Sequence, residues 1–389
     1  MKNEDWIQSI VGAVRSVVPE ADTPVSLHEP SIGGRAWDYV KDCLDSGWVS
    51  SVGQYVDRFE RDLARFTGSG FAVATVNGTA ALHVALLLAG VKAGDEVVVP
   101  SLTFIATANA VSYIGAVPHF ADIEERTLGI DPVKLRTHLE KIGYMQGGVL
   151  YNRQTNRPIR AVVPMHTFGH PVDLDSLAEL CDDFGMALVE DAAESLGSYY
   201  KGKHTGTFGV LSSLSFNGNK IVTTGGGGAI LTDDPDLAKR AKHLTTTAKL
   251  THAWEYIHDA VGFNYRLPNI NAALGCAQLE QLTEFVEAKR RLFSSYDASF
   301  AQVEGVRLYA EPEQSKSNYW LQTIILEPEN AIYREDVLFA LHEAGYLCRP
   351  AWRLINRLEM YAGMPSMDVN TADSLAARII NIPSGAAIG

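Results

Sequence analysis

Short apolar runs alternate with helix-like segments between about residues 70 and 230. The runs FAVATV, EVVVP, AVVPM and ALVEDA are rich in β-branched residues, and TAALHVALLLAG, ATANAVSYIG and DLDSLAELCDDFG follow the first three in turn. Strands that alternate with helices predict βαβ units and a parallel sheet. Because these runs are continuously apolar, we expect helices to cover both faces of that sheet.

The pattern changes after SFNGNKIVTTGGGGAIL. A long helix is predicted at ALGCAQLEQLTEFVEAKRRLF, long enough to bridge two lobes, followed by a strand at WLQTIILEP and a helix at REDVLFALHEAG. We therefore expect an α/β chain with an N-terminal helix (1–24), a large domain (25–285) and a smaller C-terminal α+β domain (286–389). The chain ends at NIPSGAAIG without a predicted final helix. A shortened C-terminus would explain this ending.

The first segment is expected to form an amphipathic helix and does not resemble a signal peptide. It places Trp6, Ile10, Val14 and Val17 at helical spacing, but it begins with acidic residues and stops at Pro19. No run approaches the roughly 18 apolar residues of a membrane span, so a soluble protein is expected. The cysteines are far apart and form no CxxC pair, which favours a cytoplasmic location.

The composition argues against nucleic acid as a binding partner. With 33 basic and 46 acidic residues the formal charge is 33 − 46 = −13, so a broad basic face for nucleic acid is not expected. A hydrophobic content of 46% and a charged content of 20% are ordinary for a globular protein. Local cationic pockets that bind phosphate remain compatible with this charge.

Polar residues follow several of the predicted strands, where parallel sheets bind ligands. After FAVATV come Asn77, Gly78 and Thr79, at the start of a helix whose free N–H groups can hold a phosphate or can simply be capped by Asn77. Asp191 ends ALVED and is followed by small residues, against which the ring of a ligand could lie. Its carboxylate can either keep a heterocyclic nitrogen of that ring protonated or simply cap the strand end. Lys220, near Ser215, is either a solvated loop lysine or an amine that attacks a carbonyl.

Seven segments together resemble the DegT/DnrJ/EryC1/StrS nucleotide-sugar aminotransferases, which are fold-type-I pyridoxal-phosphate enzymes. The resemblance spans nearly the whole chain. It rests on PVSLHEPSIGG, DSGWVSSVGQYVDRFE, VNGTAALHVAL, PSLTFIATANAV, VEDAAESLGS, SFNGNK and GFNYRLPNINAALG, in that order. It implies the aspartate-aminotransferase-like fold, with a mostly parallel sheet in the large domain, and pyridoxal 5'-phosphate as cofactor.

The resemblance implies roles for individual residues. Lys220 matches the lysine that binds the cofactor covalently, Asp191 the partner of the pyridine nitrogen and Glu194 a second polar contact near the ring. Phe104 matches the aromatic residue that stacks on the ring, although an ordinary core phenylalanine is an equal alternative. The matching phosphate ligands are Gly78, Thr79 and Ser215.

The family also implies a homodimer with shared active sites. Asn264 of GFNYRLPN matches a residue that reaches the phosphate of the neighbouring subunit. Arg266 is a candidate for the carboxylate of the amino donor, or else a structural salt-bridge residue. His166 is a candidate near the cofactor. His166 and His170 stand four apart, but Gly169 and Pro171 oppose a helix there, so no metal site is expected.

The details favour a C4 aminotransferase of the legionaminic-acid or bacillosamine type, in cell-surface glycan biosynthesis. Such an enzyme converts a nucleotide-linked 4-keto-6-deoxy-2-acetamido sugar to the 4-amino sugar with glutamate as donor. Trp320 and Arg349 are candidates for substrate binding, although packing between lobes would explain them equally. One alternative is a GDP-perosamine-type or 3-amino-sugar aminotransferase. A second is a sugar dehydratase of the same family, but such dehydratases have histidine at the position of Lys220, so Lys220 argues against it. A third is a non-catalytic regulatory protein that binds the cofactor.

Overall fold

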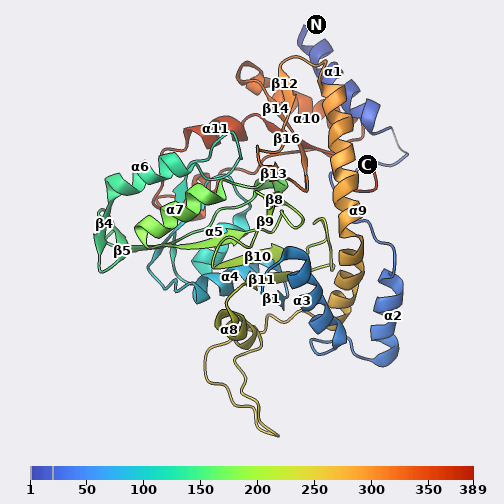
Figure 1. Ribbon diagram of the computed structural model, residues 1–389. Helices are drawn as coiled ribbons and strands as arrows, with labels where there is room; N and C mark the ends of the chain where they lie inside the picture. Colours follow the sequence, from blue (N-terminus) through green and yellow to red (C-terminus); the bar gives the residue numbers. More distant parts are fainter. Residues whose placement is uncertain (1, 20–21) are drawn as a thin grey trace.

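A large, mostly parallel sheet forms the centre of the computed structural model, which describes residues 2–19 and 22–389 (Figure 1). Within this described part the sheet has nine strands, with the order β1-β11-β10-β7-β6-β2-β3 and the hairpin β4–β5 beside β6. Strand β11 runs antiparallel to both of its neighbours, and β10, β7, β6, β2 and β3 are parallel. The strands are β1 (Phe71–Thr75), β2 (Glu96–Pro100), β3 (Val117–Ala121), β4 (Gly143–Gln146), β5 (Val149–Asn152), β6 (Pro158–Val162), β7 (Ala187–Asp191), β10 (Leu211–Ser215) and β11 (Gly228–Thr232).

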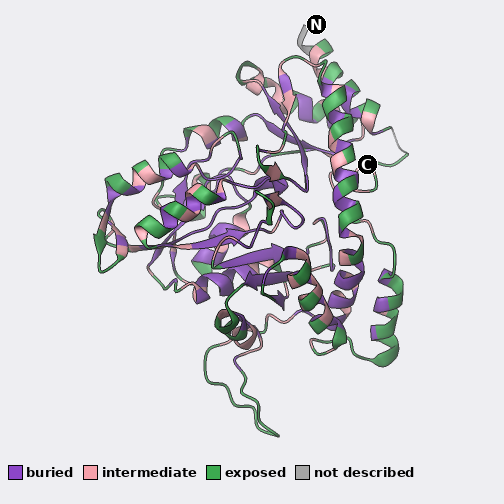
Figure 2. Cartoon of the chain, in the orientation of Figure 1, coloured by how far each residue is buried: buried purple, intermediate pink, exposed green. Residues whose placement is uncertain are grey.

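Helices cover both faces of this sheet, which confirms the expectation from the continuously apolar runs. Along β2, Val97 and Val99 belong to the cluster that includes α4 and α5, whereas Val98 belongs to the cluster of α6 and α7 on the other face. Strand β2 is accordingly buried along its whole length, and the centre of the sheet is drawn as buried in Figure 2. The helices are α4 (Gly78–Leu88), α5 (Ile105–Tyr113), α6 (Pro132–Ile142), α7 (Leu174–Phe184) and α8 (Pro235–Thr245).

A second, antiparallel sheet lies in the C-terminal part of the chain, with the order β12-β14-β16-β15. The helix α1 (Lys2–Val17) packs on it together with α10 (Arg334–Glu343), and Ile10, Val14 and Leu341 share one buried cluster with Ile324. The remaining elements of this region are β12 (Val306–Leu308), β14 (Gln322–Leu326), β15 (Arg349–Pro350), α11 (Asn370–Ala376) and β16 (Ile379–Ile382). A small sheet of β8 (Tyr199–Tyr200), β9 (Lys203–His204) and β13 (Ser315–Lys316) joins the two parts.

The long helix α9 (Asn269–Phe300) runs along one side of the molecule beside both sheets (Figure 1). Its first half packs on α2 (Ala36–Ser46) and α3 (Gln54–Thr67), and its second half packs on α1. The predicted domain boundary at residue 285 falls inside this helix, and the division into domains stays a prediction. In the described residues no helix is both long enough and apolar enough to cross a membrane.

An extended arm (residues 246–264) leaves the body after α8 and projects from the lower edge in the view of Figure 1. Most of its residues are exposed to solvent and are drawn green in Figure 2. Trp254 and Tyr256 are each 81% exposed and Val261 is 87% exposed.

The turn after β1 lies directly against β11. A Cβ on Gly228 would lie 2.4 Å from the carbonyl carbon of Asn77 and 2.6 Å from the amide nitrogen of Gly78. The turn that starts α4 can therefore approach the sheet this closely because residue 228 is glycine.

We expect Gly228→Ala to lower the free energy of unfolding by about 1–3 kcal/mol, since the methyl group would push the turn away from the sheet. Gly226→Ala is the matched control, because a Cβ there meets no atom within 4 Å. Urea denaturation of both variants measures the difference. Equal stability of the two variants would contradict the tight contact.

Candidate active site

A cavity of about 340 Å³ opens at the carboxyl ends of the central strands. Residues from the ends of β1, β7 and β10 meet there with two tryptophans from the C-terminal region. Eight of the residues singled out from the sequence line it: Gly78, Thr79, Phe104, Asp191, Glu194, Ser215, Lys220 and Trp320. The other lining residues are Asn77, Leu82, Ala106, Met165, Ala193, Asn217, Asn219 and Trp352.

The first turn of α4 forms one end of the cavity and offers backbone N–H groups. The side chain of Asn77 caps the helix by accepting a hydrogen bond from the Ala80 amide at 2.7 Å. Within the described residues, the amides of Gly78 and Thr79 have no protein partner. A Cβ on Gly78 would lie 2.9 Å from the Cβ of Ser215, so this glycine lets the turn and the Ser215 hydroxyl come together. Free amides, a helix dipole and a hydroxyl are suited to a phosphate.

Asp191 places a buried carboxylate in the cavity, at the end of β7. Its Oδ2 accepts a hydrogen bond from the Thr107 hydroxyl at 2.7 Å, and its Oδ1 accepts one from the Ala193 amide at 3.2 Å. Burial raises the pKa of Asp191, and these two hydrogen bonds offset the rise only in part. A buried carboxylate with remaining acceptor capacity is suited to a cationic N–H donor in the cavity.

Glu194, which is buried, and Lys220, which is partly buried, form an ion pair beside Asp191. The Nζ of Lys220 lies 3.3 Å from Oε1 of Glu194, and the Phe168 amide donates to Oε2 at 2.9 Å. Burial raises the pKa of Glu194 to about 7, although Lys220 and the Phe168 amide act in the opposite direction. The side chain of Lys220 is 12% exposed, so its amine is largely withdrawn from water and lies next to an acid that can exchange a proton near neutral pH.

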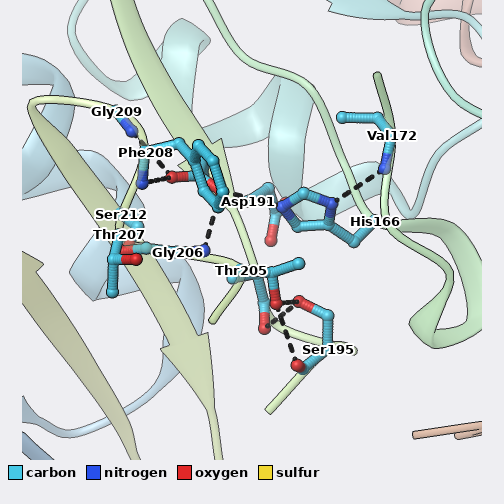
Figure 3. Close-up of polar contacts among 12 residues, drawn as sticks. His166, Val172, Asp191, Ser195, Thr205, Gly206, Thr207, Phe208, Gly209 and Ser212 are labelled. Atoms are coloured by element: carbon cyan, nitrogen blue, oxygen red, sulfur yellow. Dashed lines mark hydrogen bonds and ion pairs between the residues drawn. The ribbon is translucent and has the colours of Figure 1, made fainter. Parts of the chain in front are cut away.

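His166 lies behind the cavity and not on its wall. Its Nδ1 accepts a hydrogen bond from the Val172 amide at 3.3 Å (Figure 3), and its Nε2 pairs with Glu190 at 3.1 Å. Both ring nitrogens therefore have protein partners. The amides of residues 206, 208 and 209 also donate to Glu190. Burial alone would raise the pKa of Glu190, but the His166 hydrogen bond and these amides hold it below its usual value.

Three other predicted residues lie outside the cavity of this single chain. Asn264 is exposed at the base of the arm, where its side-chain oxygen accepts hydrogen bonds from Arg266. The backbone of Arg266 pairs with Thr75 at the end of β1, close to the first turn of α4. Arg349 lines a different cavity, with Glu335, Asp336, Leu338, Phe339, His342, Cys348 and Pro350.

Thr107 was not singled out from the sequence, although it orients the Asp191 carboxylate. It lies in the first turn of α5, fully buried, and its hydroxyl also bonds to that of Thr103 at 2.9 Å. A threonine inside a helix gives no sequence signal of its own. Met165 follows β6 and also lines the cavity; the rule that ligand-binding residues follow the strands would have identified it.

The residues of the cavity fit pyridoxal 5'-phosphate. The α4 turn and Ser215 suit its phosphate, Asp191 suits its ring nitrogen, and Lys220 supplies an amine for its aldehyde. Phe104 is 49% exposed and lines the cavity together with the small side chain of Ala193. An aromatic ring and a methyl group can hold the two faces of a planar heterocycle between them.

Comparisons with known proteins agree with this geometry. The model of the DegT/DnrJ/EryC1/StrS aminotransferase family matches residues 30–389. A GDP-perosamine synthase of Escherichia coli O157:H7 is 36% identical over 360 residues, which are 92% of this chain and 93% of that protein. A GDP-perosamine synthase of Vibrio cholerae is 35% identical over 361 residues, 92% and 94% of the two chains.

The fold agrees as well. The solved structure of Helicobacter pylori PseC, an aminotransferase involved in the biosynthesis of pseudoaminic acid, superimposes with a TM-score of 0.84 at 25% identity and covers 94% of each chain. The predicted fold class is thereby confirmed. The chain belongs to the DegT/DnrJ/EryC1/StrS aminotransferase family, and it is an aminotransferase that depends on pyridoxal 5'-phosphate.

Proposed function

We propose that this enzyme transfers the amino group of glutamate to C4 of a nucleotide-linked 4-keto-6-deoxy sugar. The observation that carries the proposal is the placement of the Lys220 amine, 3.3 Å from Glu194 in a cavity that Asp191 also lines. An amine, a proton-exchanging acid and a buried carboxylate are the groups that amino transfer requires.

When bound, pyridoxal 5'-phosphate supplies an electron sink that stabilises negative charge on the carbon that carries the amino group. Asp191 holds a proton on the ring nitrogen, because a buried carboxylate favours a cationic partner. With the cofactor bound, the Lys220 amine would take the proton from the α-carbon of glutamate in the first half of the reaction and would deliver a proton to the sugar carbon that receives the amino group in the second half. Glu194 holds the free amine of Lys220 in the cavity through their ion pair and exchanges protons with it.

The phosphate is held by the amides of Gly78 and Thr79 and by the Ser215 hydroxyl in this proposal. Phe104 and Ala193 would hold the cofactor ring between them. These contacts fix the orientation of the ring relative to the amine of Lys220, so that binding energy is used to position the reacting groups. The apolar walls of Leu82, Met165 and Trp352 exclude water from the reaction.

Two acceptor sugars are in question. The sequence motifs favour a 2-acetamido sugar of the bacillosamine or legionaminic-acid type. The two relatives at 36% and 35% identity are GDP-perosamine synthases, which favours a GDP-linked acceptor that leads to perosamine. Both products carry the new amino group at C4. We retain the GDP-linked sugar as the second candidate.

We further propose that the active enzyme is a homodimer that shares its sites. Asn264 and Arg266 lie at the base of the exposed arm, outside their own cavity. In a dimer they would serve the neighbouring cavity, Asn264 at the phosphate and Arg266 at the carboxylate of glutamate. The exposed side chains of Trp254, Tyr256 and Val261 support this proposal, because a partner would cover them. A cytoplasmic location completes the proposal and is supported by free, buried cysteines.

Lys220→Ala is expected to lower kcat by at least about 10³-fold, because it removes the group that moves the proton. The variant should also lack the visible absorption of the covalently bound cofactor while its far-ultraviolet circular dichroism is unchanged. Lys92→Ala, at an exposed lysine in a loop, is the matched control and should keep full activity. Turnover by Lys220→Ala would refute the role of this lysine.

The acceptor is identified by turnover with a panel of nucleotide-linked keto sugars, with glutamate as donor and products read by mass spectrometry. We expect the highest kcat/KM with a 4-keto-6-deoxy sugar and release of one 2-oxoglutarate per amino sugar. Comparison of a UDP-linked 2-acetamido sugar with a GDP-linked sugar without the acetamido group separates the two candidates. Preference for a 3-keto sugar would overturn the assignment to C4.

The proposed homodimer is tested by replacing exposed side chains of the arm and measuring the mass of the protein in solution. Light scattering should give twice the chain mass for the wild type. Changing Trp254, Tyr256 and Val261 together to serine should shift the mass towards the monomer at micromolar concentration and should reduce activity. Val133→Ser, at a residue that is 74% exposed on α6, is the control and should stay dimeric. A fully active wild-type monomer would exclude shared sites.

A further inference from the structure

Trp320 contacts Lys220 in two ways. The Nζ of Lys220 lies 4.0 Å from the centre of the Trp320 ring. The indole Nε1 donates a hydrogen bond to the carbonyl of Asn219 at 2.8 Å, one residue before Lys220. Trp320 therefore packs on the end of the lysine side chain and also fixes the backbone from which that side chain starts.

The same amine also contacts Glu194, with its Nζ 3.3 Å from Oε1. We call the Glu194 carboxylate and the Trp320 ring together the lysine seat. A protonated amine over an indole ring is attracted by the negative face of the ring, and the attraction grows where water is excluded. Trp320 is 4% exposed, Glu194 is 3% exposed and the Lys220 side chain is 12% exposed, so both contacts are largely shielded from water.

Asn318 joins the two halves of the lysine seat. Its Oδ1 accepts a hydrogen bond from the Trp320 amide at 2.8 Å, and its Nδ2 donates to the carbonyl of Glu194 at 2.9 Å. The backbone beside each half has an unusual conformation: Tyr319, next to Trp320, has φ of 47°, and Phe168, whose amide holds Glu194, has φ of 57°. Such left-handed residues persist where the surrounding structure enforces them, commonly at functional sites.

The charges around the amine are few. Glu194 is in direct contact, Asp191 lies close enough to interact electrostatically, and His28 lies on the Trp320 side, with ring centres 6.5 Å apart. Burial, together with Lys289 and Lys220, lowers the pKa of His28 well below its usual value, so this histidine is neutral. The lysine seat thus offers the amine one adjacent carboxylate and one aromatic face.

We propose that Trp320 is a positioning residue for Lys220, and that the lysine seat holds the ε-ammonium group whenever Lys220 is not joined to the cofactor. The inference rests on the proposed role of Lys220. Amino transfer requires this amine to be released and then to carry a proton at the reacting carbon. A free lysine side chain has many rotamers. A lysine seat that holds the amine in one position lowers the entropy cost of placing it at the reacting carbon.

This assignment replaces the expectation that Trp320 binds the sugar. Lys220 covers one face of the indole, and Asn219 occupies its N–H. The face that Lys220 covers and the indole N–H are therefore not free for a sugar to use. Trp352 also lines the cavity, with its ring 6.4 Å from that of Phe104, and it is better placed to contact the substrate.

The test compares Trp320→Leu, Trp320→Phe and Trp352→Leu. In cofactor-free protein, each lysine is labelled competitively with acetic anhydride and the extent is read by mass spectrometry. Trp320→Leu should label Lys220 about tenfold faster than the wild type, because the amine loses its cation–π contact and its protection. Trp320→Phe keeps an aromatic face and should restore most of the protection. Trp352→Leu should leave the rate within about twofold of the wild type.

Kinetics of the cofactor-loaded enzyme provide the second measurement. Trp320→Leu should lower kcat by about 10–100-fold with little change in KM for the keto sugar, and Trp320→Phe should recover most of kcat. A raised KM with unchanged Lys220 labelling would restore the sugar-contact role and overturn the proposal. A lower melting temperature with unchanged labelling would show a merely structural role and would overturn it as well.

Failure of the proposed function would look different. In that case the wild-type protein would bind no cofactor at Lys220 and release no 2-oxoglutarate, whatever the labelling showed. The labelling experiment needs neither cofactor nor substrate, so it decides the existence of the lysine seat independently.

Discussion

The burial of three carboxylates within five residues of the end of β7 constrains the rest of the site. Glu190, Asp191 and Glu194 are each at most 5% exposed, and a buried carboxylate is stable only if partners surround it. Each finds a different set. Glu190 receives His166 and three amides, Asp191 receives Thr107 and one amide, and Glu194 receives Phe168 and Lys220.

The three sets of partners differ in how completely they stabilise the charge of the carboxylate. This difference distinguishes the carboxylate that supports the fold from the two that can take part in the reaction. Glu190 has the largest set of partners and a lowered pKa, and its hydrogen bonds to the amides of residues 206, 208 and 209 hold that loop in place. Asp191 and Glu194 are under-compensated and have raised pKa values. These two line the cavity. Perturbed acids in a cavity are the expected signature of catalytic groups.

Sequence reasoning predicted the parts of this arrangement that leave a local signal. The strand ends, the capped turn at Asn77 and the lysine after β10 stand next to apolar runs, so their place at one edge of the sheet followed from the pattern. The partners could not be predicted in the same way. Thr107 and Asp191 are 84 residues apart, and Lys220 and Trp320 meet through the fold. The antiparallel strand β11 and the arm also leave no periodic signal, because both depend on contacts with distant segments.

The smaller sheet contributes to the chemistry through two tryptophans, Trp320 before β14 and Trp352 after β15. Their position depends on how that sheet sits on α9. Lys289 of α9 is fully buried there and donates hydrogen bonds to the carbonyls of Trp320 and Ser384. Burial lowers the pKa of Lys289 to about 7, so it costs stability to keep this amine charged. The hydrogen bond from Lys289 to the Trp320 carbonyl is directional, so it constrains the orientation of this backbone as well as its position. Apolar packing alone would constrain the orientation less. The cavity is therefore a joint product of two sheets, and the placement of the Lys220 amine depends on both.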